Sequence, residues 1–145
     1  MNASAQALSI ALVSKIACIS TIIRAEIPAA VVDLSPWLTD CKTQQTFDPM
    51  SLDFGVSFSS SQPNLRCSCI LLQVVFSEKL KRNAFKFKGI EATGHDYCGQ
   101  YWRFSSLEGC QFSGMHIPTE DSQQSLKQLF SQIHVLFGYP ATLPQ

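Results

Sequence analysis

The segment SLDFGVSFSSSQPNLRCSCILLQVVF, residues 51–76, decides the fold class of this chain. Its first half places Leu52, Phe54, Val56 and Phe58 at every second position, an alternation that predicts a strand with one buried face. The apolar run RCSCILLQVVF, residues 66–76, predicts a second and more buried strand. Turn-forming residues fill the SSSQPN stretch at 59–64, so a turn separates the two strands.

A third strand is expected shortly after this pair. In KLKRNAFKFKG, residues 79–89, Phe85 and Phe87 alternate with Lys86 and Lys88, which predicts one buried and one solvated face. Gly89 ends the alternation, and we expect the strand to stop there.

The last part of the chain, IPTEDSQQSLKQLFSQIHVLFG, has the signature of an amphipathic helix. Thr119 is a good N-cap, two acids follow it in the first turn, and Gly138 is placed to end the helix. The apolar residues with helical spacing are Leu126, Leu129, Phe130, Ile133, Leu136 and Phe137. The sequence therefore predicts an α+β fold, a small antiparallel sheet of three or more strands with a C-terminal amphipathic helix packed on it.

Composition indicates one folded domain with no net charge. The chain has 145 residues, of which 46% are hydrophobic and 15% charged, unlike a disordered segment. Eleven basic and eleven acidic residues cancel, so no global charge favours nucleic acid, membranes or acidic substrates. Any electrostatic role must be local.

Residues 1–25 differ from the rest of the chain, because they contain no acid and are apolar or small from Ala7 to Ile23 except at Lys15 and a few hydroxyl positions. We interpret them as a targeting or signal segment that is cut after Ala25, which leaves residues 26–145 as a single secreted domain. Lys15 interrupts the apolar run and no basic residue precedes it, so two alternatives stay open. They are an organelle transit peptide and a buried or membrane-associated first helix.

Cleavage would remove Cys18 and leave five cysteines: Cys41, Cys67, Cys69, Cys98 and Cys110. In an oxidising compartment these predict two disulfides and one spare thiol, which could bridge a dimer. Cys67 and Cys69 are separated by one residue and are expected to have different partners. The connectivity is not determined by the sequence.

A metal site is the alternative use of these cysteines. Cys67 and Cys69 form a Cys-x-Cys pair, and His95 and Cys98 form a His-x-x-Cys pair further along. Thiolates and imidazoles in two such pairs are ligands that zinc accepts in a tetrahedral site.

The same region resembles a GRF-type zinc finger, a family that binds single-stranded nucleic acid. The resemblance rests on CSC at 67–69, NAFKFKG at 83–89, CG at 98–99 and YWRF at 101–104. That family has a Gly-Arg pair before its aromatic residue and a third cysteine about where Ile90 stands, so the resemblance implies that His95 replaces the missing ligand. It also implies an intracellular zinc module.

A local basic run fits that alternative. Five cations, Lys79, Lys81, Arg82, Lys86 and Lys88, fall within ten residues. Phe85 and Phe87 are interleaved with them, a composition that resembles a stacking platform for single strands. Solvated lysines that prevent aggregation at a sheet edge are the simpler explanation.

Catalysis is the third class of function. A thiolate needs a nearby base, so Cys98 with His95, His116 or His134, and with Asp96 orienting the ring, is the candidate arrangement. No nucleophile elbow, phosphate-binding loop or HExxH motif is present in the sequence. We therefore expect a non-enzymatic binding protein whose partner is another protein, with Trp102 in the core and Pro36 and Trp37 anchoring an extended segment near Cys41.

Overall fold

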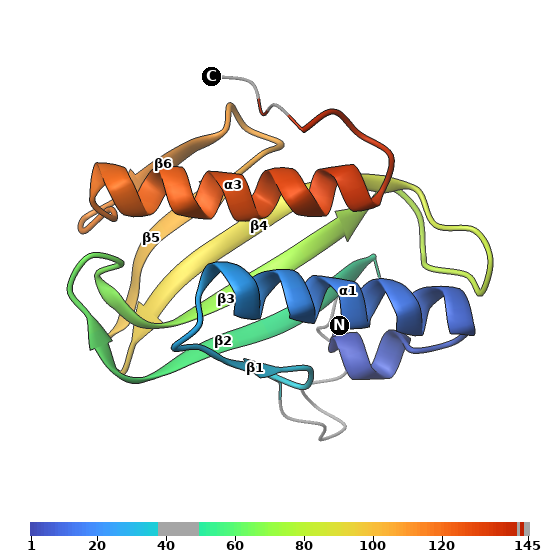
Figure 1. Ribbon diagram of the computed structural model, residues 1–145, viewed down its shortest axis with the longest axis horizontal. Helices are drawn as coiled ribbons and strands as arrows, with labels where there is room; N and C mark the ends of the chain where they lie inside the picture. Colours follow the sequence, from blue (N-terminus) through green and yellow to red (C-terminus); the bar gives the residue numbers. More distant parts are fainter. Residues whose placement is uncertain (38–49, 142, 144–145) are drawn as a thin grey trace.

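The computed structural model describes residues 1–37, 50–141 and 143. The elements follow in the order η1 (Ala3–Gln6), α1 (Ile10–Glu26), β1 (Val31–Asp33), β2 (Ser51–Gln62), β3 (Cys67–Phe76), β4 (Phe87–Asp96), β5 (Gly99–Ser105), β6 (Gln111–Gly114) and α3 (Glu120–Leu136). The six strands form one sheet in the order of the sequence, and every neighbouring pair is antiparallel (Figure 1).

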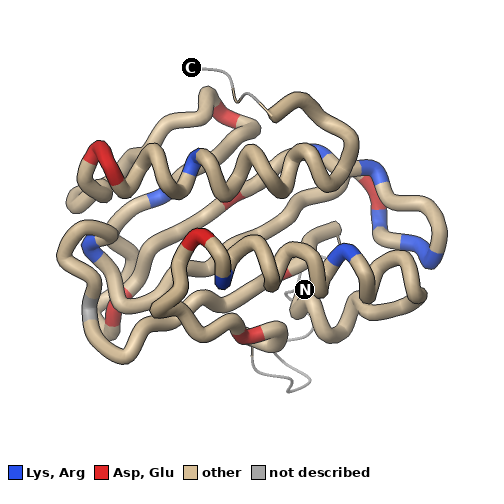
Figure 2. The backbone as a smooth tube through the Cα atoms, viewed as in Figure 1, with Lys and Arg blue, Asp and Glu red and all other residues tan. Residues whose placement is uncertain are grey.

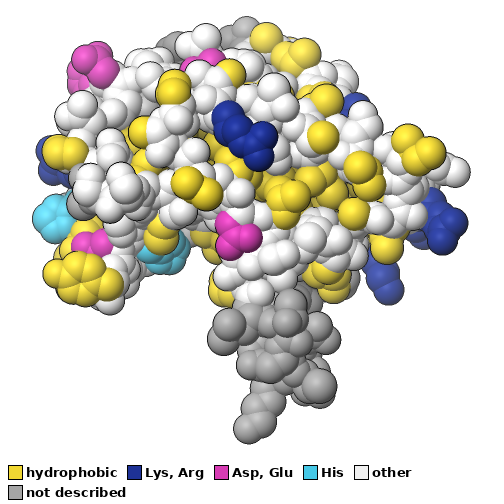
Figure 3. Space-filling model, turned by 60° about the horizontal axis from the view of Figure 1, so that its bottom comes forward, with side chains coloured by type: hydrophobic (Ala, Val, Ile, Leu, Met, Phe, Trp, Pro, Cys, Tyr) yellow, Lys and Arg dark blue, Asp and Glu magenta, His cyan; other side chains and the backbone are white. Residues whose placement is uncertain are grey.

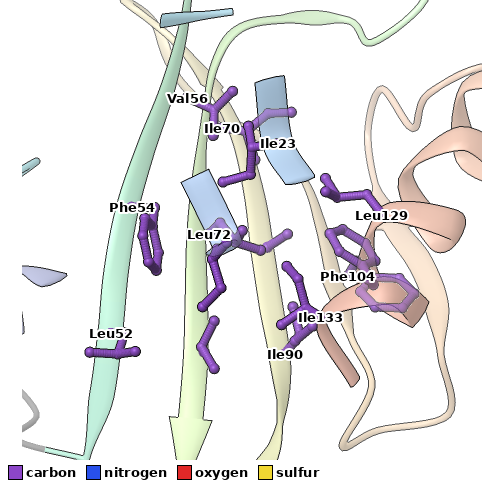
Figure 4. Packing of buried hydrophobic residues seen from close by; sticks show 14 of the residues in the cluster. Ile23, Leu52, Phe54, Val56, Ile70, Leu72, Ile90, Phe104, Leu129 and Ile133 are labelled. Carbon is purple, nitrogen blue, oxygen red and sulfur yellow. The ribbon is translucent and has the colours of Figure 1, made fainter. Parts of the chain in front are cut away.

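Cross-strand register lines up the apolar side chains on one face of the sheet. Phe54 lies opposite Leu72, Leu72 opposite Ala92, Ala92 opposite Phe104, and Phe104 opposite Phe112. Because side chains alternate between the two faces of a strand, this row fixes which face is buried. Helices α1 and α3 lie side by side over that face (Figure 1), and the core fills the space between them and the sheet (Figure 4).

Helix α3 matches its sequence signature. Thr119 caps it by accepting a hydrogen bond from the Ser122 backbone N–H at 3.4 Å, and Gly138 follows it with φ +86°. Leu126, Leu129, Phe130 and Ile133 are its buried residues. The predicted α+β fold class is confirmed, with six strands in the sheet.

Helix α1 is part of the core. Its buried apolar side chains, Leu12, Ile16, Ile19 and Ile23, recur at helical spacing and lie in the same cluster as the residues of the sheet. The predicted cleavage point after Ala25 falls inside this helix, one residue before its end. This placement favours the buried first helix among the alternatives, and cleavage itself stays an untested prediction.

Within the described residues, no helix is both long enough and apolar enough to cross a bilayer.

The third predicted strand was misplaced. Strand β4 begins at Phe87, where the predicted strand nearly ends, and it continues through Gly89 to Asp96. A Cβ atom at Gly89 would lie 2.5 Å from the Cδ2 atom of Leu107. Gly89 is therefore a position of close packing against the residues that follow β5, and it does not end the strand.

Trp102 lies in the core, as the sequence predicts. Its side chain is fully buried, and its indole N–H donates to the Leu65 carbonyl at 2.8 Å. A Cβ atom on Gly94, its register partner in β4, would lie 2.2 Å from the ring. The ring therefore fits because the facing position has no side chain.

Candidate functional site: a pocket on the open face of the sheet

The second face of the sheet, which we call the open face, is covered by no helix in the part of the chain that the structure describes. Apolar Leu71 and Val75 lie there half-buried. They alternate with the buried residues of β3, so they point away from the helices. An antiparallel sheet can leave such a face in solvent or bring it against a partner.

A pocket of about 320 Å³ lies on the open face where β1 and the residues after it meet the central strands. It is lined by Asp33, Pro36, Trp37, Gly55, Val56, Ser57, Cys69, Ile70, Leu71 and His95. The volume is at the lower end of the range of ligand pockets, and the lining is mostly apolar with a few polar groups. We call it the Trp37 pocket.

The indole that forms one wall of this pocket is held by a buried carboxylate. Trp37 donates from Nε1 to Asp53 Oδ2 at 2.6 Å, and its backbone N–H donates to Asn2 Oδ1 at 2.9 Å. Asp53 is only 2% exposed and also accepts from the Met1 amine at 2.9 Å and from Ser51 Oγ at 2.7 Å. These bonds fix the position of the ring before any ligand arrives.

Gly55 forms part of the pocket floor. A Cβ atom there would lie 3.2 Å from Pro36 Cβ and 3.4 Å from Asp33 Cβ, so the residues after β1 pack closely on this strand position. The lack of a side chain at Gly55 leaves room for the apolar wall beside it.

Two titratable side chains of the Trp37 pocket, His95 and Cys69, have pKa values shifted toward their neutral forms. Burial lowers the pKa of His95 from its ordinary value, and His95 Nε2 lies 2.7 Å from Thr93 Oγ1. Burial, together with the negative charge of Asp96, raises the pKa of the Cys69 thiol. A protonated thiol is a poor nucleophile, so the pair is suited to binding rather than to thiolate chemistry.

The predicted catalytic arrangement around Cys98 is not assembled. Asp96 accepts a hydrogen bond from the Cys98 backbone N–H at 2.7 Å, which makes an Asx turn at the tip of the hairpin between β4 and β5. The same carboxylate, as the acceptor of a hydrogen bond from Tyr101, raises the pKa of that phenol to about 12. Among the described residues, no hydrogen bond joins the Cys98 thiol to a histidine ring, and His134 Nδ1 lies 2.8 Å from the Phe130 carbonyl oxygen in α3.

The four proposed zinc ligands are spread over different environments. Cys67 is fully buried, and burial raises the pKa of its thiol to about 12. Cys69 and His95 are register partners at the Trp37 pocket, whereas Cys98 is exposed at the hairpin tip. Among the residues in view, no group of three or more His, Cys, Asp or Glu is placed to hold a metal ion.

The resemblance to a GRF-type finger gains no support from this arrangement. Ile90, at the position of that family's third cysteine, is fully buried in the core. Zinc binding stays an untested prediction.

The predicted disulfides are also untested. Cys18, Cys67, Cys69, Cys98 and Cys110 are free thiols in the structure, and Cys41 lies outside the described residues. Cys67 and Cys110 are buried, while Cys18 and Cys98 are exposed. Their pairing in an oxidising compartment stays a prediction.

The basic run lies mainly on the connection between β3 and β4, at one end of the molecule. Its aromatic residues do not form an exposed platform, because Phe85 and Phe87 both pack on Phe137, with Phe87 stacked on it at 4.8 Å. Lys86 pairs with Glu78 at 3.1 Å. Nucleic-acid binding by this run is untested. Because these two rings pack on Phe137, they do not support the hypothesis that they stack on bases.

The Trp37 pocket was missed by sequence reasoning. Asp53 occupies a wet position in the alternating pattern of β2, where an acid normally indicates solvent. Its hydrogen bond to Trp37 joins residues that no local pattern connects. The adjacent Pro36 and Trp37, which the sequence predicts to anchor an extended segment, were the one available signal of this pocket.

Comparison with known proteins gives one result. A family model described as a domain of unknown function matches residues 4–139, a range that includes α1, all six strands and α3. A comparison with curated proteins finds no match, and a comparison with solved structures also finds none. Since the family model covers nearly the whole chain, the chain belongs to this family, a domain of unknown function.

Proposed function

We propose that this domain is a non-enzymatic binding module that docks on a protein partner through the open face of the sheet. An apolar side chain of the partner enters the Trp37 pocket and acts as the anchor of the interface. One observation carries the proposal, namely a preformed, mostly apolar pocket on a sheet face that no described helix covers.

Polar groups near the pocket support a protein partner. The open face carries a network in which Arg103 bonds to Glu91 at 3.1 Å and to Glu108 at 3.0 Å. Apolar anchors surrounded by half-exposed polar side chains are typical of protein interfaces, in which the centre is apolar and the rim is polar. The raised thiol pKa of Cys69 favours binding over catalysis at this place.

The test uses capped amino acids as mimics of the anchor. N-acetyl-leucinamide and N-acetyl-phenylalaninamide are titrated into isotope-labelled protein, with N-acetyl-glycinamide as the probe without a side chain. We expect saturable amide shift changes at Gly55, Leu71 and His95 for the two apolar probes, with dissociation constants on the order of mM for such small ligands. The glycine probe should cause none.

A matched pair of variants localises the effect. Ser57 is exposed at the edge of the Trp37 pocket, so Ser57→Phe should fill the pocket and abolish the shift changes. Ser59→Phe, an exposed change two residues along β2 and outside the pocket lining, should leave them intact. Shift changes that survive Ser57→Phe, or that map to the helices, would contradict the proposal.

A further inference from the structure

A second surface lies at one end of the molecule, where the start of α1 meets the connection between β3 and β4. Ser9, the N-cap of α1, donates from Oγ to the Arg82 carbonyl at 2.5 Å, so the two segments are in contact. Figure 2 shows Lys and Arg gathered at this end, beside the first turn of α1. This surface shares none of the lining residues of the Trp37 pocket.

Exposed apolar side chains form one half of this surface. Ile10 is 90% exposed, Val13 49% and Leu8 43%. Ile10 and Val13 are three residues apart on a helix and therefore lie on neighbouring positions of one face. Hydrophobic and basic side chains border each other at the right-hand end of the molecule in Figure 3.

Unpaired cations form the other half. Lys79, Lys81 and Arg82 are exposed, and within the described residues none of them has an ion pair. Glu78, the acid beside them, is engaged by Lys86 at 3.1 Å. Leu80, which is 3% exposed, anchors the connection in the core and leaves its basic neighbours in solvent.

We propose that this end of the domain docks on an anionic lipid surface. Lys79, Lys81 and Arg82 contact the headgroups, and the side chains of Leu8, Ile10 and Val13 enter the boundary between headgroups and acyl chains. Exposed aliphatic residues next to uncompensated cations are the two features that such binding requires. The domain would lie on the membrane without crossing it.

Charge alone would suit nucleic acid equally well, and the apolar half decides between the two. Phosphate backbones offer no partner for Ile10, whereas single-strand binding needs exposed rings for base stacking. The nearby rings of Phe85 and Phe87, which alternate with Lys86 and Lys88, pack on the half-buried Phe137. An anionic lipid surface is therefore the partner that can contact both the apolar side chains and the cations.

Co-sedimentation with vesicles tests this proposal. The full chain is mixed with vesicles of phosphatidylcholine alone or of phosphatidylcholine with phosphatidylserine, at low and high salt. We expect sedimentation with the anionic vesicles, weakened by salt because surface charges are screened, and little with the neutral ones. Replacing Lys79, Lys81 and Arg82 by Gln together should weaken partitioning by about fivefold per charge, or about 100-fold in all.

The apolar half is tested separately with a matched control. Ile10→Ser should weaken partitioning by about tenfold while the salt dependence stays unchanged. Met115→Ser, at a residue 81% exposed on the connection between β6 and α3, should change nothing. Far-ultraviolet circular dichroism checks that the variants are folded, which is expected because the replaced side chains are exposed.

Three results would overturn the proposal. They are no sedimentation with either kind of vesicle, unchanged partitioning of Ile10→Ser, and binding of a single-stranded oligonucleotide as tight as that of the anionic vesicles. The proposal does not rest on the Trp37 pocket, so Ser57→Phe should sediment like the unaltered chain.

Discussion

Ser20 lies on the buried side of α1, and among the described residues its hydroxyl oxygen has no hydrogen-bond partner. Burying an unpaired hydroxyl costs about 1 to 3 kcal/mol. We expect Ser20→Ala to raise the free energy of unfolding by about 1 kcal/mol in urea denaturation, because it removes that cost and favours the helix.

The neighbouring residue provides the control for this prediction. Thr21 is exposed, and its Oγ1 donates to the Ala17 carbonyl at 3.0 Å. Thr21→Ala should change the free energy of unfolding by no more than about 0.5 kcal/mol. A loss of stability in Ser20→Ala would mean that the hydroxyl has a partner, such as a buried water.

His95 links stability to pH. Its pKa is lowered by burial, so between that pKa and the ordinary value of 6.5 the unfolded chain binds more protons than the folded one. Its contribution to stability is complete above about pH 6.5 and is lost as the pH falls through the lowered pKa. Because other groups also titrate, the unaltered chain must be compared with a variant.

His95→Gln keeps a polar group that can bond to Thr93 Oγ1 but does not titrate. We expect the unaltered chain to lose more stability than His95→Gln between about pH 7 and pH 5. Denaturation curves at several pH values measure the difference. Equal losses would show that the histidine titrates alike in the folded and unfolded chain.

Helix α3 offers the sharpest contrast between two faces of one element. Phe130 is 1% exposed and its ring stacks on Phe104 with centroids 4.7 Å apart. Phe130→Ala leaves a cavity and should cost about 3 to 5 kcal/mol. Gln128→Ala, on the exposed face, should cost no more than about 0.5 kcal/mol. Chemical denaturation at constant m-value measures both changes.

Gln132 is not a suitable control for that experiment, because its Nε2 donates to Glu26 Oε1 of α1 at 2.7 Å. An equal loss at Phe130 and Gln128 would mean that α3 is buried on all sides. No loss at Phe130 would mean that its ring is not in the core.

Elements with a strong local pattern could be predicted, and the others could not. Strands β2 and β3 and helix α3 carry regular apolar spacing, and they are found close to where that spacing puts them. Strand β5 was missed because its apolar positions, Trp102 and Phe104, are too few to set a period, and β6 has four residues. Helix α1 is apolar on nearly every side, so its pattern does not separate a core helix from a targeting segment.

At the scale of the whole molecule, the fate of residues 1–25 can be tested by truncation. A chain that begins at Glu26 loses four buried side chains of α1, each worth about 1.5 to 3 kcal/mol. Their sum is comparable to the usual stability of a domain, about 5 to 15 kcal/mol. We therefore expect residues 26–145 alone to show no cooperative thermal transition.

N-terminal sequencing of the protein from its natural source completes this test. A mature product that starts at Glu26 and unfolds cooperatively would contradict the core role of α1 and restore the interpretation of a cleaved signal. A product that keeps Cys18 and the rest of α1 agrees with the packing in the structure.

Thiol reactivity tests the predicted disulfides across the whole chain. Without disulfides, the exposed Cys18 and Cys98 should react with Ellman's reagent within the first fast phase, and the buried Cys67 and Cys110 only after unfolding. Under denaturing, non-reducing conditions, five or six free thiols would contradict the disulfide prediction. One or two free thiols would support it, and bound zinc found by metal analysis would support the zinc alternative.

The strand order of the sheet has a consequence for synthesis of the chain. Each strand pairs with the next one in sequence, so the sheet can grow as the polypeptide leaves the ribosome, but α1 precedes all of its strands. At about 5 to 20 residues per second, roughly 5 to 20 seconds pass between completion of α1 at residue 26 and of α3 at residue 136. Throughout that interval the apolar side chains of α1 are not fully covered by the rest of the fold. They are therefore exposed to chaperones and targeting factors, which bind apolar segments of this kind.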